Sequence, residues 1–148
     1  MSKVHYPDAV AAVLEQDLCL QDGSIDVERW STTVFLPLTM VAGGRTFAIC
    51  DQTALCEHLR ALERKSRELR IASFRTNVKT VLQASDDMSI ISVVRERLRK
   101  DGVALGKSSI TFSILRVEEE WLINQVMFND SRHDPSVVAQ AFLRWSDY

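Results

Sequence analysis

The second half of the chain alternates hydrophobic and polar residues with a period of two. This pattern is typical of β-strands with one buried face. It predicts long strands over residues 72–82, 88–100, 108–117 and 121–128. Polar turn segments separate them at residues 85–87, 101–102 and 118–120. Residues 71–128 are therefore expected to form one large, curved antiparallel sheet.

The first half of the chain begins with apolar residues at helical spacing: Val10, Val13, Leu14 and Leu18. They predict a helix that starts near Pro7, since proline suits the first helical position, and ends at Asp22 and Gly23. A short second helix should follow and carry Trp30. Its indole is expected either to fill the core between the helices and the sheet or to line a cavity.

Residues 33–41 read as a strand that Pro37 interrupts, which predicts an edge strand or a bulge. Gly43 and Gly44 form a hairpin turn into residues 45–50. Asp51 stands at the N-cap of a helix over residues 52–68, and a short terminal helix is expected over residues 137–145. The predicted fold class is α+β, in a single domain spanning residues 1–148, with the helices gathered on one face of the curved sheet.

The composition narrows the classes of function. The 148 residues carry a formal net charge of −2, so no nucleic acid partner is expected. No apolar run reaches the ~20 residues of a membrane helix, and the first residues do not resemble a signal peptide, so a cytoplasmic protein without membrane contact is predicted. The three cysteines lack metal-site spacing, and we expect no metal or cofactor. Arg95, Arg97 and Arg99 alternate along one strand, which indicates a solvated face or, alternatively, an anionic partner.

Three segments resemble the nuclear transport factor 2-like superfamily, which has a cone-shaped α+β fold. They are the helix end at residues 20–23, the hairpin at residues 43–51, and the arginine- and tryptophan-bearing hairpin at residues 112–123. The resemblance extends from about residue 7 to residue 128. It implies a cone with the N-terminal helices on its concave face, and a homodimer formed through the sheet. The superfamily includes ketosteroid isomerase-like enzymes, SnoaL-like cyclases and dehydratases, and the small subunits of ring-hydroxylating dioxygenases, so the fold does not determine the function.

The ketosteroid isomerase mechanism is disfavoured at the matching positions. The phenol donor would fall near Gln16, the base near Thr39 or Met40, and the acid donor near Ser113. None of these side chains can perform the assigned step. Glu96 is the remaining candidate for a catalytic base. If the turn at residues 85–87 is short, Glu96 faces the apolar side of the sheet, where desolvation would raise its pKa. A turn one residue longer reverses the face and makes Glu96 a surface charge.

A capped cone leaves a concave apolar space. Its predicted lining residues, each of which could also be plain core, are Trp30, Phe35, Phe74, Asn124 and Phe128. The predicted function is the binding of a small apolar or carbonyl-containing molecule in this space. One alternative is a non-catalytic assembly subunit resembling the dioxygenase small subunits. A second is a SnoaL-like cyclase or dehydratase that uses Glu96 as its base.

Overall fold

The computed structural model describes residues 5–129, which form eight strands and three helices. The helices are α1 (His5–Asp17), α2 (Val27–Ser31) and α3 (Gln52–Glu68). The first four strands are β1 (Leu20–Gln21), β2 (Ser24–Ile25), β3 (Val34–Ala42) and β4 (Arg45–Ile49). The long strands are β5 (Ser73–Ser85), β6 (Met88–Leu98), β7 (Ala104–Val117) and β8 (Glu120–Phe128). The expected helix over residues 137–145 lies outside the described residues.

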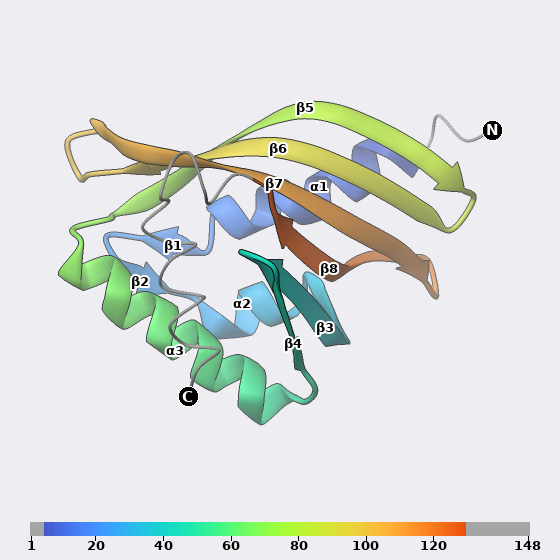
Figure 1. The fold of residues 1–148 in the computed structure, drawn as a ribbon, viewed down its shortest axis with the longest axis horizontal. Coiled ribbons are helices and arrows are strands. Elements are labelled where there is room, and N and C mark those ends of the chain that lie inside the picture. Colours follow the sequence, from blue (N-terminus) through green and yellow to red (C-terminus); the bar gives the residue numbers. More distant parts are fainter. Residues whose placement is uncertain (1–4, 130–148) are drawn as a thin grey trace.

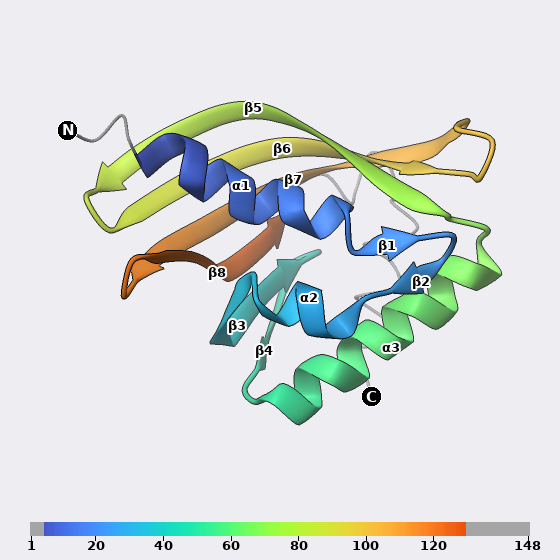
Figure 2. The ribbon, with the colours of Figure 1, turned by 180° about the vertical axis from the view of Figure 1, so that it is seen from behind.

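Six strands form one sheet in the order β4-β3-β8-β7-β6-β5. The long strands β5, β6 and β7 bend over α1, and α2 and α3 lie further below them (Figures 1 and 2). The predicted α+β fold, a curved sheet with helices on its concave side, is thereby confirmed. The strand pairs are antiparallel except β3 with β8, which run parallel.

Strand β3 resolves the two alternatives for Pro37. The strand lies between β4 and β8, so the edge-strand prediction is wrong. Its pairing with β8 shifts register between Val34 and Thr39, which brackets Pro37, and the bulge prediction is confirmed. Proline has no backbone N–H to donate, and a local break in the ladder accommodates this loss within an internal strand.

The first helix ends earlier than predicted. It stops at Asp17, and the chain then forms the small β1–β2 hairpin, whose turn contains Asp22 and Gly23. Both residues have positive φ, of 52° and 77°, a conformation that suits a tight turn. The Asp-Gly pair therefore marks a hairpin turn rather than the end of a helix. The Gly43–Gly44 turn between β3 and β4 is as predicted.

Helix α3 has the predicted bounds and the predicted cap. The Asp51 carboxylate accepts a hydrogen bond from the Ala54 amide at 2.8 Å. Its buried face includes Leu55, Leu59 and Leu62, which pack in the core enclosed by the helices and the concave face of the sheet. Among residues 5–129, no helix is long and apolar enough to cross a membrane.

Candidate functional site

Strand β6 brings two arginines to the inner face of the sheet. Its side chains alternate strictly, and the buried set is Ser89, Ile91, Val93, Arg95 and Arg97. The prediction that these arginines lie on a solvated face is wrong, since Arg95 is 7% exposed and Arg97 is 2% exposed. The cationic side chains therefore lie inside the cone, at its concave surface.

Glu96 points the other way. It pairs across the strands with Arg75, and the carboxylate lies 2.8 Å from the Arg75 guanidinium on the outer face. The short-turn register would have set Thr76 opposite Glu96, but Thr76 lies opposite Arg95. The ladder shifts by one residue between Val78 and Thr80, and beyond this shift Arg95 rather than Glu96 lies on the inner face with Phe74. The prediction that Glu96 faces the cavity is wrong, and with it the geometric basis for a catalytic base at this position.

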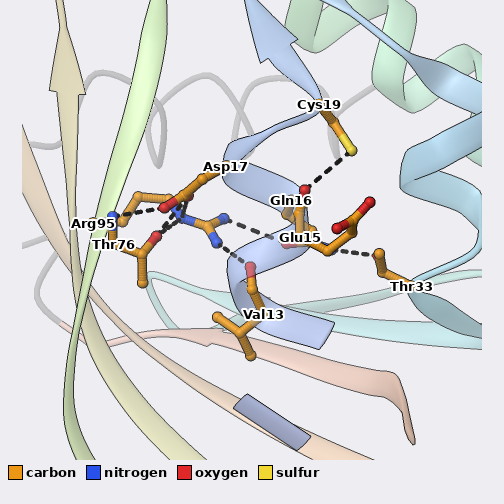
Figure 3. Close-up of polar contacts among 8 residues, drawn as sticks. All are labelled: Val13, Glu15, Gln16, Asp17, Cys19, Thr33, Thr76 and Arg95. Atoms are coloured by element: carbon orange, nitrogen blue, oxygen red, sulfur yellow. Dashed lines mark hydrogen bonds and ion pairs between the residues drawn. The ribbon is translucent and has the colours of Figure 1, made fainter. Parts of the chain in front are cut away.

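Arg95 extends from β6 to α1 and connects the sheet to the first helix (Figure 3). Its Nε donates to Thr76 Oγ1 at 2.8 Å and lies 3.3 Å from the Asp17 carboxylate. Its terminal nitrogens donate to the Gln16 side chain at 3.4 Å and to the Val13 carbonyl at 3.3 Å. Thr76 in turn donates to Asp17 from both its amide and its hydroxyl, each at 2.7 Å. Each oxygen of the Asp17 carboxylate therefore accepts one hydrogen bond from Thr76.

The surroundings of Arg95 explain why a buried cation is tolerated. Its guanidinium carbon lies 5.6 Å from the centre of the Phe74 ring and 5.4 Å from that of Phe112, within the range of cation–π attraction. Burial lowers the pKa of Arg95, whereas the nearby Asp17 raises it. Arginine side chains remain protonated in proteins even where burial lowers their pKa. Arg95 thus places a fixed positive charge at the inner wall.

Arg97 lies one pleat further along β6. Its Nη1 donates to Ser108 Oγ on β7 at 2.7 Å. The residue directly across from Arg97 in the ladder is Gly106, and a β-carbon there would overlap the Arg97 guanidinium. The missing side chain at Gly106 therefore makes the space in which Arg97 can lie flat against β7.

Arg95, Arg97 and Ser108 form the polar part of a cavity of about 30 Å³ within the cone. Its complete lining is Trp30, Leu62, Phe74, Arg95, Arg97, Ser108, Ile110 and Phe128. One water molecule occupies roughly 30 Å³ in the liquid. A cavity holds one water when about half that volume is open to the centre of the molecule, so this cavity accommodates only one or two waters. The site consequently combines apolar walls, two guanidinium groups and a hydroxyl in a small volume.

The structure separates the predicted lining residues into two groups. Trp30, Phe74 and Phe128 line the cavity. Phe35 is 38% exposed and Asn124 is half-buried, and neither belongs to the lining. Asn124 lies where the β7–β8 register shifts, and its buried Oδ1 accepts no hydrogen bond from the described protein groups. A polar atom of this kind normally has a partner, such as an ordered water.

Sequence reasoning considered an anionic partner for Arg95 and Arg97 but did not place them in the cavity, and it missed Ser108 and Gly106. The alternation of side chains along β6 could not identify the two arginines as buried, because Ile90 and Val94 make the opposite face of the strand apolar too. A weak signal was present in β7, where Gly106 and Ser108 are small residues two positions apart and therefore on one face of the strand. Small residues opposite long ones indicate that the long side chains lie across them.

The described lining residues limit the chemistry of the site. They include cations and a hydroxyl, but neither a carboxylate nor a histidine. Burial raises the pKa of the nearby Cys19 thiol to about 11, so it stays protonated at neutral pH and is a poor nucleophile. Within residues 5–129, no three metal-ligating side chains converge. This arrangement is suited to holding an oxygen acceptor rather than to removing a proton.

Known proteins are similar to this chain mainly in fold. An NTF2-like protein of unknown function from Shewanella oneidensis MR-1 has a TM-score of 0.64 at 15% identity, over 84% of this chain and 98% of that one. A ketosteroid isomerase-like protein from Erwinia carotovora atroseptica SCRI1043 gives 0.61 at 16% identity, over 84% and 94%. A protein of unknown function from Mycobacterium tuberculosis gives 0.66 at 14% identity, over 98% and 88%. These identities support the fold alone.

No curated protein matches the chain. A family model described as NTF2-like protein (DUF6841) matches residues 9–131, which include the cone sheet, most of α1, all of α2 and α3, and both cavity arginines. Because that match spans most of the 148 residues, the chain belongs to this NTF2-like family.

Proposed function

We propose that the cone cavity binds a small apolar molecule through a carbonyl or carboxylate oxygen. The observation that carries this proposal is the position of Arg97 and Ser108, which together with Arg95 form the polar part of a cavity whose other lining residues are apolar. Guanidinium groups present several N–H donors in one plane and suit an oxygen acceptor, above all a carboxylate. The aromatic walls favour an apolar remainder, since apolar contact area removed from water contributes roughly 25 cal/mol per Å².

The small volume determines how such a ligand enters. At about 30 Å³ the cavity receives only the oxygen-bearing head group without rearrangement. A larger ligand must displace wall side chains, of which Trp30 and Phe128 come from α2 and from the end of β8. The ligand-bound protein should therefore have a wider cavity than the free protein, with these two aromatic side chains moved.

Binding without catalysis agrees best with the residues that line the cavity. The described lining residues provide donors but no general base. Asp17, the nearest carboxylate to Arg95, already accepts two hydrogen bonds from Thr76. A binding protein needs only the donors and the apolar wall.

The outer face of the sheet carries exposed apolar side chains that favour the association of two copies of the chain. Leu82 is 60% exposed and Met127 is 37% exposed. Leu82 pairs with Ile90 and Met127 with Thr111, so both lie on the same outward side as Glu96. Large apolar side chains on an exposed sheet face are a common feature of interfaces. We infer a homodimer formed through this face.

The ligand proposal is tested by calorimetric titration with matched pairs, octanoate against octanol and benzoate against benzyl alcohol. The acids should bind more tightly than the alcohols. Arg97→Met should reduce their affinity by about tenfold or more, because a charge-assisted hydrogen bond is lost. Gly106→Ala should have a similar effect, since its β-carbon displaces the guanidinium while Arg97 itself is retained.

Arg75→Met is the matched control, because it removes a guanidinium from the outer face, where Arg75 pairs with Glu96. Its affinity for the acids should equal that of the unsubstituted protein. Circular dichroism would establish that each variant is folded. Equal binding of acids and alcohols would refute the proposal, as would an equal loss of affinity in Arg75→Met and Arg97→Met.

A further inference from the structure

A basic groove lies away from the cone cavity, where four segments meet at one end of the molecule. They are the β1–β2 turn, the end of α3, the residues leading into β5, and the turn between β6 and β7 (Figures 1 and 2). Two hollows of about 260 and 400 Å³ adjoin there and share Arg70 and Lys100. Their combined lining is Asp22, Gly23, Arg67, Arg70, Ile71, Ala72, Arg99, Lys100 and Asp101. These residues define the basic groove.

The groove concentrates positive charge in a chain whose formal net charge is −2. Four of its side chains are cations and two are carboxylates. Arg99 is paired with Asp101, with nitrogen–oxygen distances of 2.6 and 3.3 Å. Arg67 donates to the Gly23 carbonyl at 3.2 Å and to Ser24 Oγ at 2.8 Å, which fixes its side chain along one wall.

Arg70 and Lys100 differ from Arg67 and Arg99 in the contacts of their side chains. Within residues 5–129, neither side chain makes a hydrogen bond or an ion pair. Each lines both hollows, so each can reach an occupant of the groove from the junction between them. Two cations that share a concave surface and have no carboxylate partner in the described part of the chain favour an anionic occupant.

The backbone at Arg70 supports a role for its side chain. Helix α3 ends in a Schellman motif, in which the Arg70 amide donates to the Arg67 carbonyl and the Ile71 amide to the Ser66 carbonyl. Arg70 occupies the left-handed position of this motif with φ of 61°, where glycine is the usual residue. Backbone amides already satisfy the carbonyls, so the arginine is not needed as a helix cap. An arginine in a conformation that favours glycine indicates that its side chain contributes elsewhere.

We propose that the basic groove binds the phosphate group of a small phosphorylated molecule. Arg70 and Lys100 contact the phosphate directly, and Arg67 lines one side of the groove. A phosphate monoester is close to a dianion at neutral pH and offers three acceptor oxygens, which match donors that converge from separate segments. A carboxylate has one charge and two oxygens and would engage fewer of them. The net negative charge of the chain disfavours a long polyanion such as a nucleic acid.

The test is a nuclear magnetic resonance titration of the full chain with glycerol 3-phosphate, with glycerol as the uncharged match. The phosphate should produce saturable shifts in the amide signals of Gly23, Arg70 and Lys100, and glycerol should produce none. Lys100→Gln and Arg70→Gly should each weaken binding by about tenfold, the loss of one charge-assisted contact. Arg64→Gln/Lys79→Gln is the matched control, because it removes two exposed positive charges outside the groove and should change affinity by less than about twofold.

Arg70→Gly also separates function from folding. Glycine adopts the left-handed conformation without strain, so the thermal midpoint of this variant should equal or exceed that of the unsubstituted chain even though it binds less phosphate. Shifts confined to other surfaces, unchanged binding by Arg70→Gly, or an equal loss in the Arg64→Gln/Lys79→Gln control would each overturn the proposal. Cavity variants such as Arg97→Met should leave this titration unchanged, so the two sites are tested independently.

Discussion

Replacing Arg95 by methionine is expected to destabilise the fold strongly, because the change leaves a carboxylate without its cation. In the unsubstituted chain Arg95 lies between β6 and α1 and pairs with Asp17 at 3.3 Å. Methionine retains an unbranched apolar side chain, so the aliphatic packing along the sheet is largely preserved. The predicted loss therefore comes from charge and hydrogen bonding rather than from a large cavity.

The magnitude follows from the contacts of the guanidinium. Removing one partner of a buried ion pair costs about 3–5 kcal/mol. The two ring contacts, with Phe74 and Phe112, add stabilisation of about 0.5–2 kcal/mol that methionine does not fully replace. Asp17 keeps its two bonds from Thr76, which places the expected loss towards the lower end of the range. We expect Arg95→Met to lower the free energy of unfolding by about 3–4 kcal/mol.

The assay is equilibrium urea unfolding followed by tryptophan fluorescence, with linear extrapolation to zero denaturant. The double variant Asp17→Asn/Arg95→Met removes both charges and should be less destabilised than the sum of its single changes, by about 1–3 kcal/mol. Arg75→Met is the control on the exposed outer face, with an expected change within about 0.5 kcal/mol. A loss below about 1 kcal/mol in Arg95→Met, or strict additivity in the double variant, would refute the reasoning.

Two further predictions concern acid stability and assembly. Burial lowers the pKa of His58 from 6.5 to about 4, so the unfolded chain takes up a proton at a higher pH than the folded chain does. The contribution of His58 to the free energy of unfolding is complete above pH 6.5 and falls by up to about 3 kcal/mol as the pH drops towards 4. The His58→Gln variant should lack this pH dependence when both proteins are unfolded with urea at a series of pH values. Parallel pH profiles for the two proteins would contradict the assignment of this effect to His58. Leu82→Glu/Met127→Glu places charges on the outer sheet face and should convert a dimer into a monomer in sedimentation equilibrium, whereas an unchanged mass would exclude this face as the interface.

The sequence alone determined the local structure wherever a residue's own chemistry specifies the backbone. Asp51 accepts the α3 amide in any tertiary context, and a diglycine at residues 43–44 adopts positive φ without strain, so the α3 bounds and the β3–β4 turn were predicted correctly. The alternation in residues 71–128 likewise predicted the long strands, because burial of one face imposes a period of two. Asp22 and Gly23 were wrongly assigned to a helix end. An Asp-Gly pair suits both a helix end and a two-residue hairpin turn, so the pair alone could not distinguish the two.

Tertiary structure alone decided which way β6 faces. Both of its faces carry apolar residues, so the sequence offered no preference between Arg95 and Glu96 as the buried side chain. The decision came from pairing with β5, which sets Thr76 beside Arg95, and from α1, which supplies Asp17, Gln16 and the Val13 carbonyl. These partners lie 19 to 82 residues away in sequence. A buried charge is stable only where such partners converge, and their convergence is a property of the assembled fold.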